Sequence, residues 1–237
     1  MTTLKKKEPL QIPLGSVRFG DLKRPSPLSR NWGYDRGTPV ARYYIEDFLG
    51  RHAGDVRGRV LELASNDYTK RFGGIRVEQS DVLAVEATNP NATIVGDLAQ
   101  EGTLPEAAFD CIIFTQALQY IYDTRRGLEM LYRALKPGGL LLTTVPGIGP
   151  MGDHPGYPEK PDRWPWYWIF TLAALRRLME DRFGEGAVAA EAHGNVFTAT
   201  AFLYGLALEE LDSSDLEVDD PRFPVTIAAR AIKRPGR

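Results

Sequence analysis

At residues 135–142 the chain reads LKPGGLLL, a predicted helix end followed by an apolar strand. The preceding segment, 125–135, places leucines on one side of a helix, which proline and glycine cannot continue. The strand predicted from Leu140 to Val145 is almost wholly apolar, as a strand is when helices cover both faces of its sheet. The stretch therefore predicts an α/β sandwich built on a mostly parallel sheet.

On both sides of this stretch, short apolar runs alternate with helical segments, and residues 31–237 form one predicted domain. Residues 1–30 carry scattered lysine, arginine, proline and serine and predict an extended arm. The pattern predicts seven strands with helices on both faces of the sheet. The predicted strands are 59–64, 75–85, 92–97, 109–114, 140–145, 187–192 and 224–232, and the other predicted helices begin at Thr38–Pro39 or span 170–183 and 197–211.

Composition excludes several classes of protein. Twenty-nine lysines and arginines stand against 31 acids, so the net charge of −2 gives no electrostatic case for nucleic acid or an anionic membrane. One cysteine and three histidines provide neither an internal disulfide nor a convincing zinc site. No apolar run approaches the roughly 20 residues of a spanning helix. We therefore expect a cytoplasmic monomer or homodimer without signal peptide, metal, membrane or nucleic-acid partner.

Three stretches resemble the class I S-adenosylmethionine-dependent methyltransferases: VLELASN at 60–66, the runs at 92–98 and 109–113, and LKPGGLLL. In addition, NWGYDRGTP at 31–39 resembles a leader in a bacterial branch that is often encoded with glycosyltransferase and natural-product genes. The resemblance implies a Rossmann-like methyltransferase sandwich with S-adenosyl-L-methionine as cofactor. It also implies a small-molecule acceptor, a sugar or natural-product hydroxyl or amine, in a biosynthetic pathway.

The first loop departs from the family, which is usually glycine-rich there so that the backbone can approach the cofactor. Residues 62–68 contain no glycine, although Ala64 and Ser65 are small. A non-catalytic binding or scaffold protein with a degenerate methyltransferase fold is therefore the alternative. A nucleotide-dependent oxidoreductase is disfavoured, because no G-x-G-x-x-G follows the first strand.

Ligands of open α/β sheets bind at the carboxyl ends of the strands. By resemblance, Glu62 orients the methionine part of the cofactor. Asp97 meets the adenine amino group, with the backbone amide of Leu98 beside it. Two acids compete for the ribose hydroxyls: Asp81 if the second strand is 76–80, and Glu86 if that strand runs through residue 85. The other predicted cofactor contacts are Tyr34, Arg36, Ala64, Asn66, Tyr68, Thr115 and Gln116.

The acceptor side is predicted in the 151–168 loop, which holds four prolines, one histidine and three of the four tryptophans. Aromatic side chains provide flat apolar walls, so Trp164, Trp166 and Tyr167 are predicted to contact the acceptor. Transfer of an activated methyl depends mainly on positioning. A base is needed only if the acceptor must lose a proton, and His154 is the predicted base for a hydroxyl acceptor.

Overall fold

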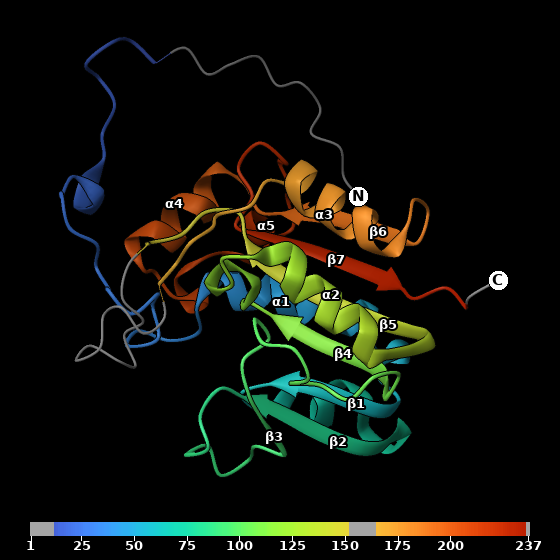
Figure 1. Ribbon diagram of the computed structural model, residues 1–237. Helices are drawn as coiled ribbons and strands as arrows, with labels where there is room; N and C mark the ends of the chain where they lie inside the picture. Colours follow the sequence, from blue (N-terminus) through green and yellow to red (C-terminus); the bar gives the residue numbers. More distant parts are fainter. Residues whose placement is uncertain (1–11, 152–164, 236–237) are drawn as a thin grey trace.

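The computed structural model describes residues 12–151 and 165–235 and contains a seven-stranded sheet in the order β3-β2-β1-β4-β5-β7-β6 (Figure 1). The first five strands pair in parallel, and β7 runs antiparallel to both β5 and β6. The predicted fold class is confirmed. The strands are β1 (Gly58–Leu63), β2 (Val77–Ala84), β3 (Ile94–Val95), β4 (Phe109–Thr115), β5 (Leu135–Pro146), β6 (Val188–His193) and β7 (Thr226–Ile232).

Helices cover both faces of the sheet because side chains alternate along each strand. Leu61, Ile112 and Leu141 point into the cluster beneath α2 (Thr124–Ala134) and α3 (Leu172–Phe183). Their neighbours Val60 and Leu142 point the other way, toward α1 (Val40–Arg51). The helix α4 (Val196–Tyr204) packs beside α1, and the short α5 (Ser213–Leu216) lies against α4.

The turn at residues 136–139 is built differently from the prediction. The helix α2 ends at Ala134, and β5 already begins at Leu135, which pairs with Phe109. Cys111 pairs with Leu140, so the lysine, proline and glycines form an irregularity inside the strand. Gly138 has φ 84°, a conformation that glycine adopts without the steric cost of a Cβ.

The start of α1 and the end of α4 also differ from the prediction. Thr38 is not the N-cap of α1: Pro39 holds that position, and the Thr38 hydroxyl donates to Glu209 at 2.8 Å instead. The predicted inner face of α1 is confirmed, since its apolar side chains are buried. The helix predicted over 197–211 ends at Tyr204, because Gly205 adopts the left-handed conformation with φ 70°.

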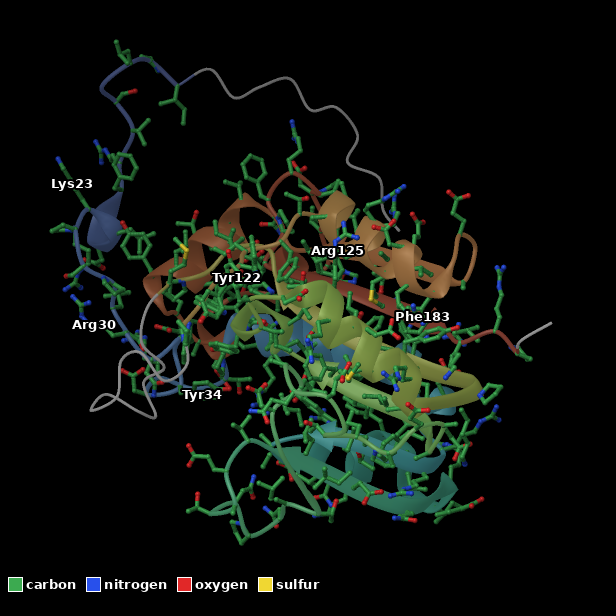
Figure 2. The ribbon with its side chains drawn as sticks, viewed as in Figure 1. Lys23, Arg30, Tyr34, Tyr122, Arg125 and Phe183 are labelled. Carbon is green, nitrogen blue, oxygen red and sulfur yellow. The ribbon has the colours of Figure 1, made fainter. Side chains whose placement is uncertain are left out.

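Residues 12–30 leave the body of the molecule, with Lys23 and Arg30 projecting from them (Figure 2). Most of these side chains are exposed. The segment is tied to α4 where the amide of Leu28 donates to the Tyr204 carbonyl at 2.8 Å and the Tyr204 hydroxyl donates to the Leu22 carbonyl at 2.5 Å. In the described part of the chain, no helix has the length and apolar character needed to cross a membrane.

Candidate active site

Two cavities adjoin at the edge of the sheet where its parallel strands end. The larger, about 820 Å³, holds two carboxylates, Glu86 and Asp97, and is called the acidic cavity here. The ends of β1, β2, β3 and β4 and the residues that follow them form most of its walls, which is where ligands of such sheets bind. It is lined by Leu63, Ala64, Leu83, Ala84, Val85, Glu86, Thr88, Asn89, Gly96, Asp97, Leu98, Phe114, Thr115, Gln116, Ala117, Tyr120, Ile121, Pro165 and Tyr167.

Of the two acids that competed for the end of the second strand, Glu86 lines the acidic cavity and Asp81 does not. The strand β2 runs to Ala84, so the condition for Asp81, a strand that stops at 80, is not met. Asp81 lies within the strand, is 5% exposed, and binds the Arg59 guanidinium at 2.7 Å. The Thr93 hydroxyl donates to it at 3.0 Å. Its carboxylate is therefore used inside the fold.

Asp97 follows β3 and lines the acidic cavity together with buried Leu98. One carboxylate oxygen of Asp97 accepts the amide of Ala99 at 2.8 Å, which fixes the side chain. Ala64, directly after β1, has φ 65° and is exposed to the same cavity. A methyl group is therefore the only side chain at the position where the family usually has glycine.

Besides Asp81, three predicted cofactor residues line neither cavity. Glu62 is buried and accepts the amides of Tyr68 and Thr69, so its carboxylate caps the helical turn that follows β1, and burial raises its pKa. The Asn66 side chain donates to Ser80 at 3.2 Å. Arg36 pairs with Glu210, which is part of the contact between the leader and the segment after α4. None of the three lines either cavity.

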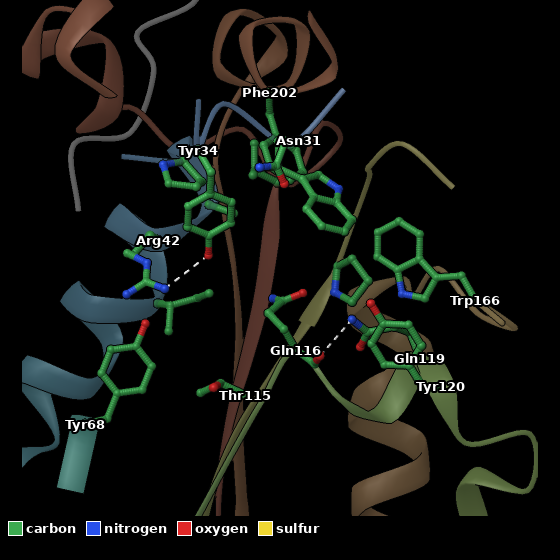
Figure 3. A pocket seen from close by; sticks show the side chains of 16 residues that line it. Asn31, Tyr34, Arg42, Tyr68, Thr115, Gln116, Gln119, Tyr120, Trp166 and Phe202 are labelled. Carbon is green, nitrogen blue, oxygen red and sulfur yellow. Dashed lines mark hydrogen bonds between the residues drawn. The ribbon is translucent and has the colours of Figure 1, made fainter. Parts of the chain in front are cut away.

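The smaller cavity, about 580 Å³, is walled mainly by rings and is called the aromatic cavity (Figure 3). Tyr34, Tyr68 and Trp166, all predicted site residues, line it; Tyr167 lines the acidic cavity instead. Tyr34 and Tyr68, which were predicted to contact the cofactor, thus face the second cavity. Its lining is Asn31, Trp32, Tyr34, Pro39, Ala41, Arg42, Ile45, Tyr68, Thr115, Gln116, Gln119, Tyr120, Pro146, Trp166, Phe202 and Val225.

The cavities share one wall, formed by Thr115, Gln116 and Tyr120 just after β4. Burial raises the pKa of Tyr120 to about 12, so its hydroxyl stays protonated at neutral pH. Among the described residues, four that are not glycine have positive φ, and three of these line a cavity: Trp32, Ala64 and Gln116. Backbone strain gathers at functional sites, so this distribution supports the location.

Two predicted residues, His154 and Trp164, lie outside the described residues. Sequence reasoning missed Arg42, Gln119, Tyr120 and Phe202. The polar and aromatic residues at 119 and 120 follow the end of the fourth strand and could have been found by the strand-end rule. Arg42 reads as an ordinary surface residue of a helix. No cluster of three or more histidine, cysteine, aspartate or glutamate side chains suited to a metal occurs in the described ranges.

Comparison with known proteins agrees with this fold. Residues 53–143 match the methyltransferase domain family, and this match spans β1 to most of β5. The chain has the fold of the class I S-adenosylmethionine-dependent methyltransferases. The structure of an S-adenosylmethionine-dependent methyltransferase from Mesorhizobium loti superposes with a TM-score of 0.52 and 16% sequence identity. The match covers 84% of this chain and 100% of that chain. The family resemblance predicted from the sequence is confirmed.

Two curated relatives match part of this chain in sequence. A probable S-adenosylmethionine-dependent methyltransferase of Mycolicibacterium smegmatis is 25% identical over 57% of this chain and 53% of its own length. The ubiquinone/menaquinone biosynthesis C-methyltransferase UbiE of Edwardsiella ictaluri is 33% identical over 46% and 53%. The chain thus spans about half the length of these relatives. Their names and the matched family support the predicted cofactor, S-adenosylmethionine.

Proposed function

We propose that this protein transfers a methyl group from S-adenosylmethionine in the acidic cavity to a small molecule in the aromatic cavity. The observation that carries the proposal is the wall of Thr115, Gln116 and Tyr120, which both cavities share. Because these residues line both cavities, a methyl donor in one and an acceptor in the other would lie next to each other there. Methyl transfer chiefly needs the two reactants to be held in line. The cavity volumes of about 820 and 580 Å³ suit two small ligands.

The residues of the acidic cavity fit the chemical groups of the cofactor. Glu86 would accept hydrogen bonds from the ribose hydroxyls, as a carboxylate does with a diol. Asp97 would accept from the adenine amino group, with the Leu98 amide beside it. Ala64 leaves room for the methionine part, and Thr115 and Gln116 would lie beneath it. The bound cofactor supplies a methyl already activated by the positive sulfur.

What remains for the protein is orientation and, for some acceptors, removal of a proton. Tyr120 is protonated at neutral pH and is therefore suited to donate a hydrogen bond rather than to act as a base. The predicted base His154 and the predicted wall Trp164 stay proposals. The acceptor is proposed to be a hydroxyl or amine of a sugar or natural product in a biosynthetic pathway. A carbon acceptor is the alternative, since one relative is named a C-methyltransferase.

Titration with S-adenosylmethionine and S-adenosylhomocysteine tests the proposal. A ligand at 100 times its Kd stabilises the native state by about 2.7 kcal/mol, which raises Tm by roughly 5–10 °C in a domain of this size. ATP and NAD serve as controls and are expected to give no shift. A scaffold protein that kept only the fold would respond to none of the four ligands, and calorimetry would then show no heat of binding.

A further inference from the structure

Among the described residues that line the aromatic cavity, the cation is Arg42, which α1 places between two tyrosines (Figure 3). Its guanidinium donates to the Tyr34 hydroxyl at 3.1 Å. The guanidinium carbon lies 5.8 Å from the centre of the Tyr34 ring and 5.9 Å from that of Tyr68. Two aromatic faces and a hydroxyl therefore hold this side chain at the cavity, where it is half-buried.

Among the described residues, carboxylates compensate the charge of Arg42 only weakly. Glu46, one turn along α1, is 3.9 Å away and lies closer to Arg71, at 2.8 Å. None of the described residues that line the aromatic cavity is aspartate or glutamate. A positive charge near low-dielectric aromatic walls favours an anion and disfavours a cation in the same space.

The opposite wall of this cavity is flat and apolar. The rings of Tyr120 and Trp166 are stacked, with centroids 6.2 Å apart and an interplanar angle of 20°. Trp32 meets Trp166 edge-on at 6.5 Å. Figure 3 shows Gln116 between this wall and Arg42, and Gln119 beside Tyr120. The Oε1 atom of Gln119 is buried, and no described residue forms a hydrogen bond with it.

We infer that the acceptor is a flat ring compound that carries a carboxylate or phosphate, with its oxyanion on Arg42 and its ring on Trp166 and Tyr120. Arginine suits both oxyanions because its planar guanidinium can bind them through two parallel hydrogen bonds. The inference rests on the proposed function and narrows its acceptor. Among the acceptors left open above, it selects anionic ones and argues against aliphatic amines, which are cations at neutral pH.

Three probes with the same ring and different charge test the inference: 2-naphthoate, 2-naphthyl phosphate and 2-naphthylmethylamine. Each is titrated by calorimetry into the protein saturated with S-adenosylhomocysteine. At least one anion is expected to bind tenfold or more tightly than the amine, and the tighter anion identifies the oxyanion. Equal or tighter binding of the amine overturns the inference.

Variants separate the charge from the ring contact. Arg42→Gln is expected to weaken the preferred anion at least tenfold and to leave neutral 2-naphthalenemethanol unchanged. Arg177→Gln, which changes an exposed arginine paired with Asp181 on α3, is the matched control and should alter neither. Trp166→Leu should weaken all four probes. Unchanged anion binding in Arg42→Gln overturns the inference, provided that the variant still binds S-adenosylhomocysteine and is thus folded.

The proposed function can fail independently. If the wild type does not bind S-adenosylhomocysteine, the proposed methyl transfer is wrong, and the same probes titrated into the protein alone still decide whether the aromatic cavity prefers anions. In that case the Tm of each variant replaces cofactor binding as the measure of folding. If S-adenosylhomocysteine binds but the anions are not preferred, the methyltransferase proposal stands and the acceptor class is wrong.

Discussion

The two cavities of this molecule are built in different ways. The acidic cavity takes most of its walls from residues that directly follow β1, β2, β3 and β4, so neighbouring strands bring them together. The aromatic cavity combines the leader and α1, which adjoin in the sequence, with α4 and the segment before α3, which lie far from them in the sequence. The first is built on the edge of the sheet, and the second is built mainly from helices and loops outside the sheet. We therefore expect the sheet edge to determine cofactor binding, and these helices and loops to determine which acceptor binds.

The sharpest test of the acidic cavity compares Glu86 with Asp81. Glu86→Ala removes the carboxylate proposed for the ribose hydroxyls and should weaken S-adenosylhomocysteine by about 3 kcal/mol, or roughly 150-fold, the upper range for charged hydrogen bonds. Calorimetry measures the Kd. Glu78→Ala, at the other end of β2, is the control and should leave the Kd unchanged.

Asp81→Ala should give the opposite result. The Kd for S-adenosylhomocysteine stays as in wild type. The free energy of unfolding in urea falls by about 1–3 kcal/mol, because the Arg59 guanidinium and the Thr93 hydroxyl lose their acceptor. A large loss of cofactor affinity in folded Asp81→Ala, with none in Glu86→Ala, would reverse the assignment.

The stability of the protein should depend on pH through His193. His193 ends β6, and its ring nitrogens lie 3.1 Å from Asp219 and 3.2 Å from Glu191. Burial alone lowers the pKa of His193, but the hydrogen bonds to these two carboxylates outweigh burial and raise it to about 9. The ring also stacks on Tyr44 of α1, with centroids 6.0 Å apart.

A raised pKa means that the folded state binds the proton more tightly than the unfolded state. The stability contributed by His193 is therefore complete below about pH 6.5, its unfolded value, and is lost as the pH rises toward 9. A shift of this size corresponds to about 3–4 kcal/mol. Urea unfolding at several pH values between 6 and 9.5 measures it. His193→Gln should flatten this part of the profile and His52→Gln should not; equal slopes in wild type and His193→Gln would contradict the role.

A third change probes the adenine end of the acidic cavity. Asp97→Ala should weaken S-adenosylhomocysteine by about 1–2 kcal/mol, or roughly 5–30-fold, less than Glu86→Ala because one Asp97 oxygen is engaged with Ala99. Asp67→Ala, an exposed acid in the loop after β1, is the control. If both variants bind S-adenosylhomocysteine as wild type does, Asp97 does not hold the cofactor.

The sheet could be predicted because each strand is a local apolar run and the alternation of strands and helices limits the topology. Element ends were less predictable, since they depend on tertiary contacts. Thr38 has a capping side chain but gives its hydroxyl to Glu209, 171 residues away. The apolar pattern of α4 continues past Tyr204, yet the left-handed Gly205 turns the chain away.

The site residues also divide into those that local sequence predicts and those that depend on tertiary contacts. Asp97, Thr115 and Gln116 line the acidic cavity as the strand-end rule predicts. Glu62 is also near a strand end, but its carboxylate turns to the amides of the next helical turn, which the sequence alone does not reveal. Arg42 could not be predicted, because its place beside Tyr34 follows from how the leader folds onto α1.

The smallest effect concerns the glycine-free loop. Ala64 has φ 65°, and an L-residue with a Cβ is strained in that region by roughly 1–2 kcal/mol. Ala64→Gly should relieve this strain and, after the extra chain entropy of glycine in the unfolded state, stabilise the protein by up to about 1 kcal/mol. Ala107 is the matched control: its φ is 47°, but it lies outside both cavities. Ala107→Gly should raise the free energy of unfolding to a similar extent.

Of these two variants, only Ala64→Gly can affect cofactor binding, because Ala64 lines the acidic cavity and Ala107 does not. If the loop is already competent as alanine, both variants keep the wild-type Kd for S-adenosylhomocysteine. A tighter Kd in Ala64→Gly alone would show that the methyl group obstructs the cofactor and that this chain has lost affinity relative to glycine-containing loops. A weaker Kd in Ala64→Gly alone would mean that the methyl group itself contacts the cofactor, and the loop would then be a specialised surface rather than a reduced one.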